Sequence, residues 1–382
     1  MNRLAMVSLR KALVISSLLL VSVLGNYSIS PAAVSGACVN CHTMHNSQGG
    51  QPMAYSYSGG SFVADETANP SLLITDCIGC HTATDGTTWK DASTGAPIVY
   101  NTSAPTYGAT SDGGTTYQGL AAGNFYWVEA GDDANGHNIL SDDAYLDEAP
   151  GDKSGCASNN ACHVNFHLTY TGVGALNGRA ACQGCHMVSG DGSSLSVTAF
   201  HHKDDTGPVI DTADEGWYRF LAGHYNADGH GVSGIEDPDW EHSPTSAVHN
   251  EYYGYDGDKT AEQILASSDS MTGFCVGCHG NFHKQDATVA GSSPWFRHPS
   301  DAPLPNSGEY TGYTVYNPLV PVARPSLSTV SSTVTPGTDM VMCLSCHRAH
   351  ASPYYKMVRW DYKSTTLSTA LTGCSVCHTS KN

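Results

Sequence analysis

Every cysteine of this 382-residue chain belongs to a pair that a histidine follows directly. The fourteen cysteines therefore form seven pairs. The third pair along the chain, Cys156/Cys162/His163, has five residues between its cysteines. The other six have the spacing Cys-x-x-Cys-His, and they are Cys38/Cys41/His42, Cys77/Cys80/His81, Cys182/Cys185/His186, Cys275/Cys278/His279, Cys343/Cys346/His347 and Cys374/Cys377/His378.

Cys-x-x-Cys-His is the attachment signature of c-type haem. Two thiols three residues apart on a short helical turn reach the two vinyl groups along one porphyrin edge, and the next residue directs its imidazole at the iron. Covalent attachment holds a haem even where the surrounding chain is thin. The sequence therefore predicts seven c-type haems, with all fourteen cysteines as thioether partners and these proximal iron ligands: His42, His81, His163, His186, His279, His347 and His378.

Two other uses of paired cysteines are disulfides, common in exported chains, and structural zinc sites. Neither requires a histidine after every second cysteine. Histidine makes up only 19 of 382 residues, so seven such coincidences are very improbable. At Cys156/Cys162 alone, a disulfide beside an unrelated His163 is a stronger alternative. A longer loop can still place both thiols on the vinyl groups, so we count this pair as the seventh haem site.

The second axial ligands can come from the twelve remaining histidines. His45 and His350 follow a motif histidine by three residues, and His167 and His283 follow one by four. At these spacings both side chains lie on one face of a helical turn, so the second cannot reach the far side of its own haem. It can reach the iron of a neighbouring haem. We therefore expect these four to be distal ligands that hold two haems together.

Further distal candidates come from the segments between motifs. His298 is held between aromatic neighbours and Pro299. The long gaps must also supply ligands, which makes His137, His202, His224 and His249 candidates, with His201, His230 and His242 weaker ones. If every haem takes two histidines, five of the twelve have other roles.

The first 33 residues have the layout of a secretory signal peptide. Arg3, Arg10 and Lys11 precede an apolar run over residues 12–24, and a small-residue stretch at 30–33 suggests cleavage near Ala32 or Ala33. The alternative is an uncleaved anchor, but thirteen apolar residues are few against the roughly 20 that a spanning helix needs. We expect an exported mature chain without a membrane span, in the periplasm, on the outer surface or outside the cell.

The charge balance is strongly acidic. Residues 1–33 contain three basic and no acidic residues, so their removal takes the net charge from −18 to −21. This excludes nucleic acid, whose binding relies on Lys and Arg. It is compatible with metal ions, minerals or other redox proteins as partners. Charged residues make up only 14% of the chain, against roughly 25% in ordinary domains.

With 40 glycines and few charges, the chain is predicted to be mostly loops and turns, with short helices at the motifs and few strands, wrapped around a haem stack. The alternating stretch Tyr310 to Tyr316 favours a short strand or hairpin. No linker shows a sharp change in composition, so residues 34–382 are predicted to form a single multihaem cytochrome domain.

The segments Gly36-Ala-Cys-Val-Asn-Cys-His42-Thr-Met-His45 and Cys343-Leu-Ser-Cys-His347-Arg-Ala-His350 resemble extracellular multihaem cytochromes of metal-reducing bacteria, including the hexahaem type that polymerises into conductive filaments. The resemblance covers mainly the motifs. It implies bis-histidine haems in a continuous stack, a loop-dominated fold and an extracellular role, with His42 proximal and His45 distal on another haem. The seventh haem and the insert at Cys156/Cys162 depart from that pattern.

Two function classes are compatible with these motifs. A multihaem reductase, acting for example on nitrite or hydroxylamine, needs an open iron position. All seven motifs here end in histidine and spare histidines exceed the need, which favours an electron-transfer protein with no catalytic residues. Motifs lie near both termini, at Cys38 and His378. End-to-end exchange between copies, with polymerisation into a filament, and a discrete soluble carrier with both ends folded back are both compatible with this placement.

Overall fold

The computed structural model describes residues 37–58, 61–69, 72–106, 119–130, 133–139, 182, 185–186, 201, 207–222, 231–257, 268–277, 279 and 298–380. The expected signal peptide at residues 1–33 lies outside these ranges. So do several expected site residues, namely Cys156, Cys162, His163, His167, His202, His224, Cys278 and His283. No helix in the described ranges is both long and apolar enough to cross a membrane.

Helices are short throughout the described residues. The longest α-helix, α6, has six residues. The α-helices are α2 (Cys77–Cys80), α3 (Tyr126–Glu129), α6 (Met271–Val276), α7 (Leu367–Ala370) and α8 (Cys374–Cys377). Single 3-10 turns form at η1 (Cys38–Asn40), η3 (Asp133–Asn135), η6 (Tyr218–Phe220), η8 (Gly308–Gly312), η9 (Cys343–Ser345) and η10 (Tyr355–Met357). The predicted loop-rich fold with short helices at the motifs is confirmed.

Strands are few and mostly two residues long. The longest pair, β3 (Ala54–Ser58) and β4 (Ser61–Asp65), forms an antiparallel hairpin in which Ala54 faces Asp65. Next to it lie β1 (Ser47–Gln48) and β2 (Gln51–Pro52), and β5 (Thr82–Ala83) pairs in parallel with β6 (Tyr100–Asn101). The largest sheet has the order β7 (Gly234–Ile235), β8 (Glu251–Tyr253), β10 (Ala323–Arg324), β11 (Met340–Val341), β9 (Ala302–Pro303).

The strand expected over residues 310–316 does not form. Residues 308–312 make the 3-10 turn η8, and Val315 contributes only an isolated bridge to Thr333. The segment instead lies against the C-terminal helix α8. A Cβ atom on Gly312 would come within 2.5 Å of Thr379 Oγ1, so this close approach requires a glycine.

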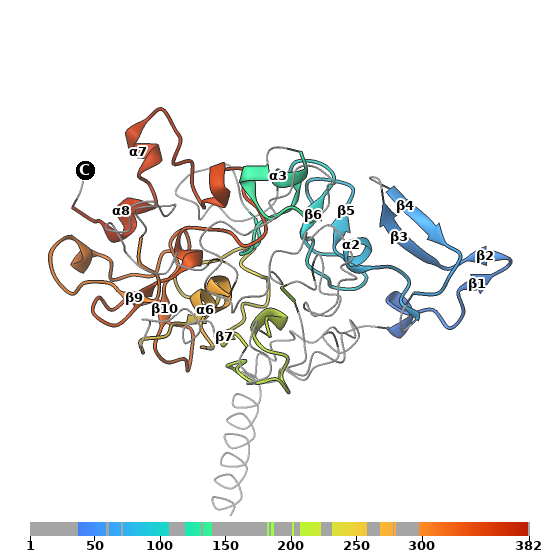
Figure 1. The fold of residues 1–382 in the computed structure, drawn as a ribbon, viewed down its shortest axis with the longest axis horizontal. Helices are drawn as coiled ribbons and strands as arrows, with labels where there is room; N and C mark the ends of the chain where they lie inside the picture. The colour runs from blue at the N-terminus through green and yellow to red at the C-terminus, as the bar shows by residue number, and fades with distance from the viewer. Residues whose placement is uncertain are drawn as a thin grey trace, which may run out of the picture.

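The two described ends of the chain lie far apart. The hairpins β1–β4 occupy one end of the long axis, and α7 and α8 lie at the other (Figure 1). Between them, four separate clusters of buried side chains replace a single large core, and three of them include or border motif cysteines. One contains Cys377 and touches Cys346, a second touches Cys185, and a third, around Phe125, touches Cys182. The apolar packing is thus distributed along the motifs.

A buried ionic network joins the strands of the largest sheet. Arg324 Nε donates to Glu251 Oε2 at 2.6 Å, and its Nη1 donates to Asp339 Oδ2 at 2.6 Å. Glu251 is fully buried and Asp339 is 3% exposed. His249 Nε2 lies 3.4 Å from Glu251 Oε1, and the His249 ring stacks on Tyr316 with 3.5 Å between the ring centroids. Removing one member leaves a buried charge without its counter-ion.

We predict that Arg324→Ala lowers the free energy of unfolding by about 3–5 kcal/mol, because Glu251 and Asp339 remain buried and unpaired. Denaturant unfolding followed by circular dichroism measures the change. Lys363→Ala, which removes an exposed cation, should change it by less than about 0.5 kcal/mol. Equal small effects of both substitutions would contradict the structural role of the network.

Candidate haem sites

The described histidine of each Cys-x-x-Cys-His motif is fixed by one backbone hydrogen bond. Its N–H donates to the carbonyl of the first cysteine of the motif, at 2.8–3.1 Å in all six, from His42, His81, His186, His279, His347 and His378. This bond closes one helical turn, which brings both thiols and the imidazole of a motif together. Side chains cap two of the turns: Asp76 accepts from Gly79 N at 2.7 Å, and Ser270 accepts from Gly273 N at 2.9 Å.

Backbone carbonyls orient several of these imidazoles. The Nδ1–H of His81 donates to Pro97 at 2.8 Å, that of His186 to Arg219 at 2.8 Å, and that of His347 to Lys356 at 3.0 Å. His137 donates in the same way to Ala349 at 2.7 Å. A carbonyl can only accept, so Nδ1 carries the proton and Nε2 keeps its lone pair. This is the tautomer in which histidine binds a metal through Nε2.

Burial keeps these imidazoles neutral. It lowers the pKa values of His81, His137, His186 and His347, and that of His350 to about 3. A neutral imidazole is the form that binds iron. These side chains are therefore competent ligands across the physiological pH range.

Four pairs of histidines face each other, and each contains one motif histidine. The ring centroids are 6.3 Å apart for His81 and His201, and 6.1 Å apart for His186 and His350. The other two pairs are His279 with His137 at 5.9 Å and His378 with His298 at 6.5 Å. None of the four second histidines belongs to the motif that it faces.

These separations fit one metal ion between two imidazoles. A metal–nitrogen bond is about 2 Å, and the ring centre lies on the order of 1 Å beyond the nitrogen, so two trans imidazoles have centroids about 6 Å apart. Direct stacking would bring the rings closer, as for His249 and Tyr316 at 3.5 Å. The residues present therefore fit an iron porphyrin at each of the four positions.

Neighbouring motifs contact one another through their cysteines. We number the motifs one to seven in chain order. The thiols of motifs two and four, Cys77 and Cys182, share a hydrogen bond, as do those of motifs five and six, Cys275 and Cys343. Burial is the main cause that raises the pKa values of Cys80 and Cys346 to about 12. The second cause is a cysteine of the neighbouring motif: Cys41 of motif one for Cys80, and Cys377 of motif seven for Cys346.

Motifs four and five are linked through two consecutive residues. The Ala349 carbonyl holds His137, which faces His279 of motif five, and His350 faces His186 of motif four. The described motifs therefore follow one another in the spatial order one, two, four, five, six, seven. This order brings together segments far apart in sequence.

The thiols lie in apolar surroundings. Burial raises the pKa of Cys185 to about 11 and that of Cys377 to about 12. The eleven described cysteines form no disulfide among themselves. The described ranges also contain no cluster of three or more His, Cys, Asp or Glu side chains arranged to hold a metal ion. The pKa values of Cys77 and Cys343 are instead lowered, in each case chiefly by the thiol of a neighbouring motif.

The remaining described candidates have other surroundings. His249, a distal candidate from the sequence, stacks on Tyr316 and lies beside Glu251 inside the buried ionic network. His45 is exposed, and its backbone N–H bonds to Thr43 Oγ1 at 3.3 Å. His242 stacks on Trp89, with 4.0 Å between the ring centroids. Conversely, His201 faces His81, although spacing alone gives no reason to rank it above its neighbour in sequence.

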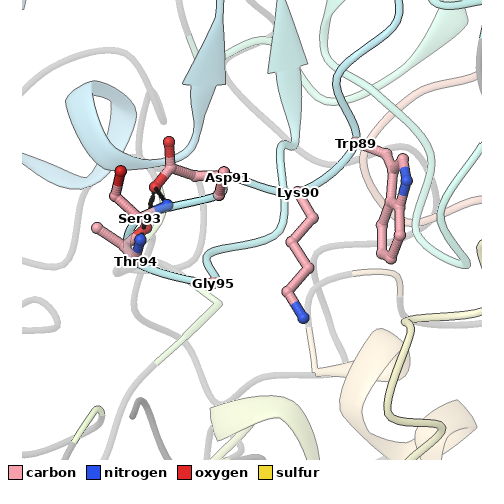
Figure 2. Close-up of a pocket in the computed structure, with 7 residues that line it drawn as sticks. Trp89, Lys90, Asp91, Ser93, Thr94 and Gly95 are labelled. Atoms are coloured by element: carbon pink, nitrogen blue, oxygen red, sulfur yellow. Dashed lines mark hydrogen bonds between the residues drawn. The ribbon is translucent and has the colours of Figure 1, made fainter. Parts of the chain in front are cut away.

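A cavity of about 450 Å³ lies beside motifs one and two. Residues 89–95 line it, and within this loop Asp91 Oδ1 accepts bonds from the backbone N–H groups of Ser93 and Thr94 (Figure 2). Asn40 Nδ2 donates to the carbonyl of Ser93 at 2.7 Å, which ties the loop to motif one. The volume is within the range of ordinary ligand pockets, but no cysteine or histidine lines this cavity.

A second buried polar network supports motif four. Arg219, whose carbonyl accepts from His186, donates through Nη2 to the carbonyl of Asp237 and to Asn250 Oδ1, and its Nη1 lies 3.1 Å from Glu236. Asp237 is 2% exposed. Burial, with the nearby Asp239 and Glu241 carboxylates, raises its pKa to about 7.

Comparison with known proteins agrees with these motifs. Residues 335–382 match the family model described as the doubled CXXCH motif. The C-type cytochrome OmcS of Geobacter sulfurreducens is 25% identical over 90% of this chain and 83% of its own length. Two similar solved structures from Geobacter sulfurreducens are each 19% identical to this chain. The Outer Membrane Cytochrome S filament has a TM-score of 0.46, and the match covers 90% of this chain and 98% of that one. The OmcS nanowires have a TM-score of 0.39, and the match covers 91% of this chain and 100% of that one. TM-scores below 0.5 do not establish a shared fold.

The motifs, the family-model match over residues 335–382 and the 25% identical relative make the chain similar to the multihaem c-type cytochromes. Its cofactor is c-type haem. Within that class it is similar to the OmcS cytochrome, with which it aligns over most of its length.

The raised pKa of Asp237 makes a pH-dependent contribution to stability. Between about pH 4 and pH 7 the folded chain keeps a proton on Asp237 that the unfolded chain releases, so the free energy of unfolding falls as the pH rises across this interval. We expect Asp237→Asn to remove about 2–4 kcal/mol of this dependence, measured by urea unfolding at about pH 4.5 and 7.5. The same pH slope in wild type and variant would contradict the assignment.

Proposed function

We propose that this chain transfers electrons outside the cell, along a row of seven c-type haems. Six sites are Cys-x-x-Cys-His motifs, and Cys156/Cys162/His163 provides the seventh. Residues 1–33 direct export, and residues 34–382 form the mature domain. The observation that supports this function most directly is the set of four facing histidine pairs, at 5.9–6.5 Å between ring centroids.

We assign the second axial ligands from these pairs: His201 to the haem of motif two, His350 to that of motif four, His137 to that of motif five and His298 to that of motif seven. When bound, such a haem supplies a one-electron iron couple whose potential depends on its axial ligands and burial. Backbone carbonyls orient the imidazoles of His81, His137, His186 and His347, and burial lowers the pKa of each. His298 remains exposed to solvent beside the C-terminal motif.

The arrangement favours electron transfer over substrate reduction. A reductase needs an open iron position, whereas each facing pair supplies a protein ligand on both sides. The spatial order one, two, four, five, six, seven also forms a continuous row from the N-terminal hairpins to α8 (Figure 1). A row with motifs at both ends suits transfer through the molecule.

We further propose that copies of this chain associate end to end. The solved structures to which it is similar are described as a filament and as nanowires. The N-terminal hairpin exposes apolar side chains, with Tyr55 43%, Phe62 46% and Val63 49% exposed. Other redox proteins and metal ions or minerals are the proposed electron donors and acceptors.

Haem counting tests the cofactor content. A pyridine haemochrome assay on the holoprotein should give seven haems per chain, and Cys156→Ser/Cys162→Ser should give six. Six haems in the wild type, unchanged in this variant, would remove motif three. Cys374→Ser/Cys377→Ser serves as the matched control, because it alters a motif with the ordinary spacing and should also lose one haem.

Axial ligation tests the transfer function. The oxidised wild type should show only low-spin ferric haem by electron paramagnetic resonance, because both axial positions are occupied. His350→Ala should convert one haem per chain to a high-spin signal. His249→Gln is the matched control, since it replaces a buried histidine outside the four pairs and should leave the spectrum low-spin. A high-spin haem in the wild type would favour the reductase instead.

A further inference from the structure

Charge is distributed unevenly along this acidic chain. The C-terminal segment 335–382 contains five basic and two acidic residues, although the whole chain has a net charge of −18. The N-terminal segment 37–106 contains one basic residue, Lys90, and five acidic ones. Figure 1 places these segments toward opposite ends of the long axis. The C-terminal segment therefore has a net positive charge and the N-terminal segment a net negative charge.

The C-terminal segment presents a compact surface formed by Tyr355, Lys356, Tyr362 and Lys363, which we call the C-terminal basic surface. Lys363 Nζ lies 3.9 Å and Lys356 Nζ 5.0 Å from the centroid of the Tyr355 ring. The ring centroids of Tyr355 and Tyr362 are 6.2 Å apart. Both lysines are exposed, and Tyr362 is 42% exposed. Tyrosine is enriched at protein interfaces, and the two lysines beside these rings add positive charge.

Few acidic groups offset this surface. Asp361 is the only acidic residue after Asp339, and Asp133 lies on η3, which packs against η10. The Asp133 carboxylate accepts from Asn138 Nδ2 at 3.1 Å. Among the described residues, no carboxylate forms an ion pair with Lys356 or Lys363.

The same surface is directly joined to a haem motif. The carbonyl of Lys356 accepts from His347 Nδ1, while the Lys356 side chain faces solvent. Lys356 and Met357 both adopt left-handed backbone conformations, with φ of 60° and 53°. Such conformations are strained for residues other than glycine, and they are held here by the bonds that fix His347. A partner on this surface would lie close to motif six.

The N-terminal segment presents the matching features. Tyr55 and Phe62 lie on one face of the β3–β4 hairpin, since Tyr55 pairs with Ala64 and Phe62 with Tyr57. Val63 is 49% exposed, and the acidic Glu66 is exposed just beyond β4. Val63 pairs with Ser56 and lies on the opposite face, so we call Tyr55, Phe62 and Glu66 the N-terminal hairpin surface. It combines aromatic area with negative charge, opposite in sign to the C-terminal basic surface.

We propose that the C-terminal basic surface of one copy docks on the N-terminal hairpin surface of a second copy. The two surfaces lie on different parts of one molecule, so the contact is head to tail and leaves a free surface at each end for further copies. Lys356 and Lys363 face the carboxylate of Glu66, and Tyr355 and Tyr362 cover the exposed hairpin rings. The inference rests on the proposed end-to-end association and specifies its interface.

Sedimentation of the full-length holoprotein at low ionic strength tests this contact. Lys356→Glu/Lys363→Glu should raise the concentration of half-association at least about tenfold, and Glu66→Lys should weaken association in the same direction. Asp214→Lys makes the same charge change as Glu66→Lys at an exposed residue outside both surfaces and should leave association unchanged. Salt at about 1 M, where the Debye length is about 3 Å, should weaken the wild-type contact.

Mixing the Lys356→Glu/Lys363→Glu variant with the Glu66→Lys variant tests the pairing of the two surfaces most directly. Each reversed surface then meets an oppositely charged partner, so the mixture should associate like the wild type while neither variant does alone. Haem content and the low-spin spectrum show that each variant is folded, and Lys356→Gln/Lys363→Gln replaces the reversal if it does not fold. The interface is wrong if the wild type associates and the charge-reversed variants associate equally well. It is also wrong if mixing the two variants does not restore association. A wild type that stays monomeric refutes the end-to-end association itself.

Discussion

The hydrogen bond from each motif histidine to the first cysteine of its pair is the interaction on which the rest of the structure depends. It closes one turn of helix, so that two thiols and an imidazole converge on one porphyrin without any larger element of secondary structure. The described residues form no single large core, and three of their four buried clusters include or border motif cysteines. Covalently held porphyrin supplies the apolar volume that a protein of this length ordinarily builds from side chains.

Segments distant in sequence place a second histidine opposite the histidine of a motif. His350 faces motif four although it follows motif six, and the carbonyl beside it, from Ala349, orients His137 toward motif five. A segment that serves two haems at once cannot move away from either, which sets the spacing of the row. The buried Arg324 network holds the sheet that carries part of this framework, and Arg219 links the His186 imidazole to a second set of buried polar groups. Rigidity between adjacent redox centres thus comes from polar bonds as much as from apolar packing.

Local spacing predicted the motifs and the loop-rich fold, because each thiol pair and its histidine lie within one helical turn. It also excluded His350 as a ligand of its own haem. It did not rank His201 above His202, since adjacent residues have the same local pattern and only the tertiary fold brings His201 opposite His81. His249 lies in a gap that could supply a ligand, yet the fold buries it against Tyr316 and Glu251. The alternating residues 310–316 resemble a strand, but contacts with α8 take precedence over this pattern.

The central claim is that histidines from distant segments complete the haem irons in the row one, two, four, five, six, seven. A cryo-electron microscopy map of the holoprotein tests it directly. We predict density for one iron between His81 and His201, one between His186 and His350, one between His279 and His137, and one between His378 and His298. Irons bound at these motifs with other axial ligands, or haems of motifs two and four that are not neighbours, would contradict the account.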